Sequence, residues 1–102
     1  MASRLNLHEE LCELLGSRNV YFQPPASVRM QYPCIKYSLS GINSKRANNQ
    51  IYNSVNKYEI VVIDRDPDSN IHNDILHHFP KCEFDRPYTA DNLYHKILTL
   101  YY

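Results

Sequence analysis

Tyr58-Glu59-Ile60-Val61-Val62-Ile63 is the stretch that decides the fold, because it is the most continuous β-branched run in the sequence. Valine and isoleucine are favoured in strands, and a run without regular polar alternation is typical of a strand buried on both faces. We therefore expect a strand over residues 56–64 that is buried on both faces in its C-terminal half.

The residues after this strand predict a turn, a helix and two further strands. Asp66-Pro67-Asp68-Ser69 has the composition of a turn. A helix from about Ser69 or Asn70 is expected to bury one apolar stripe and to end at Pro80. Strands over residues 81–88 and 93–102 follow, joined by the turn-forming pair at residues 91–92. The stripe consists of Ile71, Ile75, Leu76 and Phe79.

Before the central strand, the pattern predicts a helix, a connector, a strand and a loop. Residues 6–15 carry leucines at helical spacing, with a capping-box-like start at Asn6 and a stop at Gly16. Residues 17–30 contain two adjacent prolines and are expected to form an ordered connector. Residues 31–39 alternate as a strand. The polar residues 41–56 are expected to form a long loop.

The order of these elements predicts an α+β fold. It runs helix, strand, long loop, strand, helix, strand, strand. Helices on one side of paired strands indicate a mixed or antiparallel four-stranded sheet with two helices packed on it. The 102 residues make one domain, residues 1–102. Oligomerisation is a common remedy for the modest core of so small a domain.

Composition argues against several classes of protein. Eleven Lys+Arg against eleven Asp+Glu give a formal net charge of zero, whereas nucleic-acid-binding domains usually carry a basic excess. Three well-separated cysteines do not suggest a disulfide framework and are expected to be reduced thiols of a protein made in a cytosol. The sequence has no apolar run resembling a signal peptide or a membrane span.

Candidate catalytic and metal-binding groups are sparse. Asp64, Asp66 and Asp68 lack the glycine and glutamate of a calcium loop, which favours a turn. His72, His77, His78 and Cys82 have poor helical spacing for one metal ion, so surface histidines are expected. Cys34 lies in a predicted strand and is expected to be a buried, inert thiol. We expect no cofactor and no enzyme activity, although the sequence leaves open a distant assembly of His95, Asp85 and Cys34.

The remaining polar and aromatic residues are better explained as contacts with a partner protein than as catalytic or metal-binding groups. The 41–56 segment offers Lys45, Arg46, Asn48, Asn49 and Tyr52 for binding a partner. The sequence also holds nine tyrosines, a residue type favoured at interfaces. Among the aromatic residues, Tyr21, Phe22, Tyr101 and Tyr102 are the predicted interface anchors.

Three strings in the chain resemble the neck proteins of long-tailed, siphophage-type bacteriophages, in the tail terminator or tail-completion group. They are Arg18-Asn19-Val20-Tyr21-Phe22-Gln23-Pro24-Pro25, Met30-Gln31-Tyr32-Pro33-Cys34-Ile35-Lys36-Tyr37, and the run from Tyr58 through Asp64-Arg65-Asp66-Pro67 to Ser69. The resemblance covers roughly residue 7 onward and includes no catalytic signature. Many terminators are longer, so a segment that they use for ring contacts is missing here.

This resemblance implies a virion protein, made in the host bacterial cytoplasm, that forms a ring of usually six copies. The ring caps the tail tube and joins it to the head–tail connector or stopper protein, and DNA passes through the lumen without sequence-specific binding. One alternative is another head–tail joining protein, an adaptor or a head-closure protein. A small monomeric RNA-binding αβ module is a further alternative, which the zero net charge disfavours.

Overall fold

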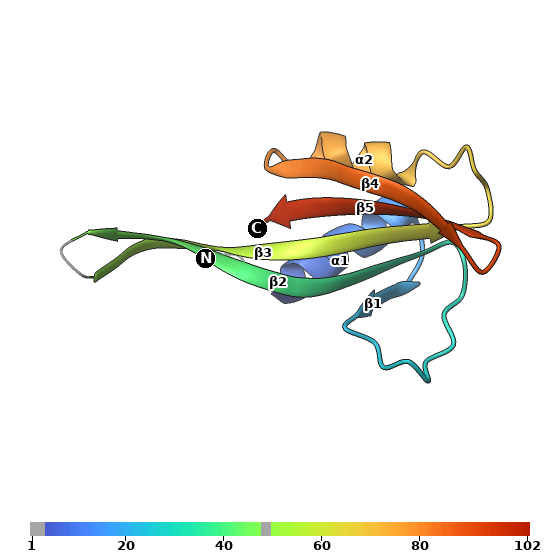
Figure 1. Ribbon diagram of the computed structural model, residues 1–102, viewed down its shortest axis with the longest axis horizontal. Helices are drawn as coiled ribbons and strands as arrows, with labels where there is room; N and C mark the ends of the chain where they lie inside the picture. The colour runs from blue at the N-terminus through green and yellow to red at the C-terminus, as the bar shows by residue number, and fades with distance from the viewer. Residues whose placement is uncertain (1–3, 48–49) are drawn as a thin grey trace.

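The computed structural model describes residues 4–47 and 50–102, which form one mixed five-stranded sheet and two helices (Figure 1). The strands lie in the order β1-β2-β3-β5-β4. β1 is parallel to β2, and every other neighbouring pair is antiparallel. The elements are α1 (Arg4–Leu15), β1 (Val20–Phe22), β2 (Cys34–Ala47), β3 (Gln50–Asp64), α2 (Ile71–His78), β4 (Cys82–Ala90) and β5 (Leu93–Tyr101).

The α+β class is confirmed, and the sheet has one strand more than the four expected. The additional strand is β1, which lies inside the segment predicted as a connector and pairs with Ile35–Tyr37 of β2. Three residues are too few to show the alternation that identifies a strand. The strand ends at Phe22, before the two prolines at residues 24–25 that prevent further pairing.

The central strand β3 is buried on both faces, as predicted. Ile60, Val61, Val62 and Ile63 are each no more than 3% exposed. Ile60 and Val62 belong to the large core on the helix side of the sheet. Val61 and Ile63 belong to a smaller cluster on the opposite, open face. A continuous β-branched run is therefore needed here, because neither face of this strand meets water.

The helix-side core is formed by one stripe of each helix and the facing side of the sheet. Leu7 and Leu11 of α1 and Ile75 of α2 are fully buried there. α1 begins at Arg4, two residues before the predicted start at Asn6. It ends where Gly16, with a φ of 80°, donates its amide hydrogen to the carbonyl of Cys12 at 2.9 Å, which confirms the predicted glycine stop.

One end of the open face is covered in part by the connector between β1 and β2. Cys34, Val61, Ile63 and Ile97 form its buried cluster. Tyr21, Met30, Tyr32 and Leu93 pack against them. The connector therefore does for this face what the helices do for the other, although it covers only the end of the sheet near Cys34 and Ile63.

The predicted end of the second helix and the predicted hairpin turn are both confirmed. α2 ends at His78, and the amide of Phe79 still donates to the carbonyl of Ile75 at 3.1 Å before Pro80 stops the helix. Between β4 and β5, Asp91 and Asn92 have φ values of 54° and 61°. Both positions of such a two-residue hairpin turn need the left-handed conformation that Asp and Asn tolerate.

The predicted long loop at residues 41–56 is the main correction. β2 and β3 continue through this segment as paired strands, with Ile42 opposite Asn56 and Lys45 opposite Asn53. The polar composition suggested a loop, but antiparallel backbone hydrogen bonds form irrespective of side-chain polarity. Residues 48–49 lie outside the described residues.

Replacing Leu11 with alanine tests whether the helix-side core holds the fold together. Leu11 is 0% exposed, and such truncations typically cost about 2–5 kcal/mol in the free energy of unfolding. Leu5→Ala is the matched control, since Leu5 is on the same helix and 66% exposed. Urea denaturation should show a large loss for Leu11→Ala and almost none for Leu5→Ala; equal losses would contradict this packing.

Candidate interaction surface

The most prominent surface feature is a two-stranded ribbon formed by the distal parts of β2 and β3 (Figure 1). The pairing of β3 with β5 stops at Lys57 opposite Tyr101, and the amide of Tyr102 donates to the carbonyl of Asn56 at 2.9 Å. Beyond that point β2 and β3 pair only with each other among the described residues. The ribbon accounts for the elongated shape, with extents of 51 × 27 × 24 Å.

The residues predicted to bind a partner fall on this ribbon. The backbones of Lys45 and Arg46 lie in β2, and that of Tyr52 lies in β3. Their side chains lie outside the described part of the structure, as do Asn48 and Asn49 altogether. The pairing therefore brings Lys45, Arg46 and Tyr52 to one projecting end of the molecule, and it places them on strands instead of a loop.

Two predicted interface anchors, Tyr21 and Phe22, make contacts within the chain. The hydroxyl of Tyr21 accepts a hydrogen bond from the amide of Gln31 at 3.0 Å, which holds the connector on the open face. The ring of Phe22 lies 5.0 Å from that of Tyr37, and the guanidinium of Arg4 lies 4.4 Å above it. Both residues keep part of their surface exposed.

Tyr102 fastens the end of the sheet to both helices. Its hydroxyl donates a hydrogen bond to the Oε2 atom of Glu10 on α1, and the Oε1 atom of Glu10 lies 2.9 Å from Nε2 of His78 on α2. The Tyr102 ring meets Phe79 edge-on at 5.9 Å. Burial and the Glu10 carboxylate raise the pKa of Tyr102 to about 12. Burial would raise the pKa of Glu10, but its bonds with Tyr102 and His78 outweigh that effect and lower it.

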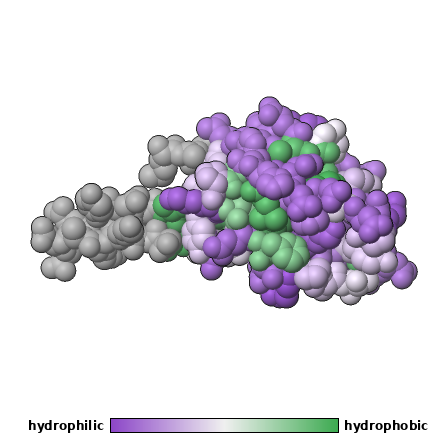
Figure 2. All heavy atoms as spheres, turned by 90° about the horizontal axis from the view of Figure 1, so that it is seen from above, coloured by the Kyte–Doolittle hydropathy of each residue, from purple (hydrophilic) through white to green (hydrophobic). Residues whose placement is uncertain are grey.

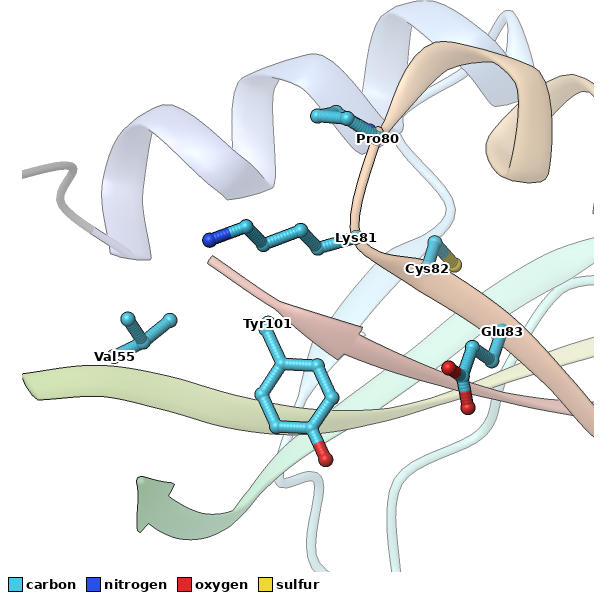
Figure 3. Close-up of a pocket in the computed structure, with 6 residues that line it drawn as sticks. All are labelled: Val55, Pro80, Lys81, Cys82, Glu83 and Tyr101. Carbon is cyan, nitrogen blue, oxygen red and sulfur yellow. The ribbon is translucent and has the colours of Figure 1, made fainter. Parts of the chain in front are cut away.

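Tyr101, the remaining predicted anchor, lines a cavity of ≈ 350 Å³ at the base of the ribbon (Figure 3). Val55 of β3 and residues 80–83, at the start of β4, complete the wall. Figure 3 shows the Lys81 ammonium and the Glu83 carboxylate at different sides of this cavity. Tyr101 therefore lies where β5 ends and the unsupported ribbon begins.

Large apolar side chains are exposed on β2, beyond its pairing with β1, and on the outer strand β4. Leu39 and Ile42 of β2 are 43% and 64% exposed, and Phe84 of β4 is 43% exposed. Leu39 is opposite Tyr58 and Phe84 is opposite Leu98, and both partners belong to the helix-side core. Viewed from the side of β4 and α2, an apolar area is surrounded by hydrophilic side chains (Figure 2). Exposed apolar residues of this kind are typical of interaction sites.

The candidate chemical groups are not brought together into a site. The carboxylates of Asp64 and Asp66 accept hydrogen bonds from the amides of Asp66 and Asp68 at 3.2 and 2.9 Å, which confirms the predicted turn. Ile63 pairs with both Cys34 and His95 and so separates them, while Asp85 is exposed in β4. Within residues 4–47 and 50–102, no group of three or more His, Cys, Asp or Glu residues is placed to hold a metal ion.

The burial of two cysteine thiols and the exposure of the α2 histidines can now be compared with the predictions. Cys34 is fully buried, and burial raises the pKa of its thiol to about 11, as expected for an inert cysteine. Cys82 is half-buried, and its thiol pKa is likewise raised to about 11. His77 and His78 are exposed as predicted, whereas His72 is half-buried with its ring 5.8 Å from that of Phe84.

Comparison with protein-family models, curated proteins and solved structures finds no match. Among the described residues, neither helix has the length and apolar character needed to cross a bilayer.

A polar cluster under α1 contains a titratable histidine, His8. Nδ1 of His8 lies 2.8 Å from the Tyr37 hydroxyl, which also accepts a hydrogen bond from Arg4 at 3.2 Å. A neutral His8 ring can accept a hydrogen bond from the Tyr37 hydroxyl at Nδ1, whereas a protonated ring cannot. Burial, followed by the charges of Arg4 and Arg18, lowers the pKa of His8 below its usual 6.5. Burial also lowers the pKa values of His72 and His95.

We expect the free energy of unfolding to rise with pH between about pH 5 and pH 7, because the unfolded chain binds more protons there than the folded chain. His8→Gln should reduce this slope, since glutamine offers Tyr37 an acceptor that does not titrate in this range. The exposed His77→Gln is the control. Urea denaturation at several pH values measures the slopes; an unchanged slope in His8→Gln would rule out this role for His8.

Replacing Tyr102 with phenylalanine tests the contact between the sheet and the helices. The substitution keeps the ring contact with Phe79 and removes the hydrogen bond to Glu10. We expect a loss of about 1 kcal/mol in the free energy of unfolding, as for a typical hydrogen bond. Tyr101→Phe, at the neighbouring position, should have little effect. Equal losses in the two variants would show that the Tyr102 hydroxyl does not stabilise the fold.

Proposed function

We propose that this chain is a structural protein of a bacteriophage neck, a ring-forming tail terminator that caps the tail tube and joins it to the head–tail connector. The observation that carries this proposal is the β2–β3 ribbon, which extends beyond the rest of the sheet (Figure 1). A projecting two-stranded ribbon contributes little to its own domain's core and is well placed to reach a neighbouring subunit or a tube end. The strings that resemble tail terminators supply the identity of that neighbour.

The charge distribution on the open face supports a subunit past which DNA moves without being held. Lys36 lies opposite Val61, and Lys57 lies opposite Tyr101. Glu59 and Glu83 flank Thr99 between the two lysines, one on each neighbouring strand. Positive and negative side chains are therefore mixed on this face. The whole chain has a formal net charge of zero. Tight binding to a phosphate backbone draws on several clustered cations, which this arrangement does not offer.

The same face favours the RNA-binding module as a second candidate. Tyr88 is 40% exposed and stacks on His95, with ring centroids 4.3 Å apart and an interplanar angle of 12°. Aromatic rings on an open sheet face are the usual platform for single-stranded bases. Glu59 and Glu83 on that face would repel phosphates. Tight binding of single-stranded RNA at physiological salt would favour this candidate, and its absence would remove it.

Shortening the ribbon tests the proposed role directly. Residues 44–54 would be replaced by Asn-Gly, which joins Asn43 to Val55, a paired position in the native register, by a two-residue turn. We expect the shortened chain to fold with unchanged thermal stability, since the core lies elsewhere, but not to cap purified tail tubes. Light scattering after size exclusion, with and without tubes, measures mass, and electron microscopy measures the fraction of capped tube ends.

The full-length chain is the control, and it should reach the mass of a ring either alone or on tube ends. Capping by the shortened chain at the full-length level would show that the ribbon does not contact the tube. A full-length chain that stays monomeric and ignores tail tubes would overturn the tail-terminator proposal itself.

A further inference from the structure

The sheet has an open edge along β2. β1 pairs with β2 only at Ile35–Tyr37, and the amide of Leu39 is then occupied by the Oε1 atom of Gln23 at 3.2 Å. From Ser40 to Ala47, the outer side of β2 has no strand beside it among the described residues (Figure 1). An edge with free backbone donors and acceptors is a template for another strand.

The opposite edge of the sheet, β4, is open over a shorter length. Pro87 has no amide hydrogen to donate, and the register with β5 shifts between Phe84 and Arg86. Both features interrupt an edge. Regular stretches remain on both sides of this interruption, at residues 82–84 and 88–90, and Phe84 lies in the first of them.

Side chains on the helix side of the two edges match each other. Ile42 of β2 is opposite Asn56, two residues from the core residue Tyr58, so it lies on the helix side of the sheet as Leu39 does. Phe84 of β4 also lies on the helix side, opposite Leu98. If one sheet continued into another through these edges, Phe84 would be placed against Leu39 and Ile42, and all three exposed side chains would be covered.

Side chains on the open face match in charge. Gly41 leaves a hollow of ≈ 270 Å³ lined by Lys57 and Tyr101, and a β-carbon added at Gly41 would meet nothing within 4 Å. With Phe84 beside Ile42, the residue beside Gly41 is Glu83 in a parallel pairing and Asp85 in an antiparallel one. In either direction an acidic residue would lie beside Gly41, near Lys57; Asp85 is at the register shift of β4 and also contacts Arg86 at 3.3 Å.

We propose that β4 of a second copy of this chain adds to the open edge of β2, with Phe84 against Leu39 and Ile42 and an acidic neighbour of Phe84 next to Lys57. The two edges differ, so the contact is head-to-tail, and repetition of such a contact closes a ring when the rotation permits. The inference rests on the ring assembly proposed above and identifies the surfaces that build the ring.

Disulfide cross-linking between two different variants tests this contact. Ile42→Cys and Phe84→Cys chains would be mixed on tail tubes and, without tubes, at high concentration, then oxidised. Both positions are exposed, so both variants should fold. We expect covalent dimers in the mixture and not in either variant alone. Val28→Cys replaces Ile42→Cys in the control mixture, because Val28 is also exposed, at 37%, but lies outside the strands.

A charge reversal gives an independent measurement. Lys57→Glu should lower the fraction of protein in the ring at least tenfold, and either Glu83→Lys or Asp85→Lys should restore it in the double variant. The substitution that restores assembly identifies the direction of pairing. Failure of both to restore it would overturn the proposed pairing on the open face.

The outcomes separate this inference from the proposed function. Rings on tail tubes without the Ile42–Phe84 link would overturn the edge pairing and leave the tail-terminator function standing. The link at high concentration, without capping of tubes, would support the edge pairing and overturn the phage function. Neither the link nor capping would overturn both.

Discussion

Double-sided burial of Ile60–Ile63 in β3 is the constraint on which the rest of the structure depends. These four residues alternate between the helix-side core and the open-face cluster, and each is almost fully removed from water. β3 is therefore in contact with the helices, with its neighbouring strands and with the segments packed on the open face. The helices cover one face, β2 and β5 flank the strand, and the connector after β1 closes part of the other face.

Unequal strand lengths around β3 create the surfaces that we assign to assembly. β3 has 15 residues and β2 has 14, whereas β5 has 9 and β1 has 3. The two long strands extend beyond their neighbours at the same end of the sheet. This extension forms the ribbon and leaves the outer edge of β2 unpaired there. Apolar residues are exposed at this edge and at β4. Such residues are expected where a surface binds a second chain.

Polar contacts attach α1 to this sheet at two places. Near the start of the helix, Arg4 and His8 converge on the hydroxyl of Tyr37. Farther along, Glu10 meets Tyr102 and, through its second oxygen, His78. Such partners position a helix more narrowly than apolar packing, because hydrogen bonds require particular distances and directions. The base of the ribbon is consequently held against both helices through the end of β5.

The sequence by itself determined the α+β class, the doubly buried strand over residues 60–63, the glycine stop at Gly16 and the turn at Asp91-Asn92. Each of these depends on local spacing or on the conformational preference of one or two residues. The sequence also selected Lys45, Arg46, Asn48, Asn49 and Tyr52 for partner contact, a prediction that stays open. The tertiary structure alone decided that residues 41–47 and 50–56 pair as a ribbon, that Val20–Phe22 is a strand, and that Phe22 and Tyr102 make contacts within the chain. It also decided which edges remain free, because a free edge is set by where strands from distant parts of the chain stop pairing, and no local pattern records that.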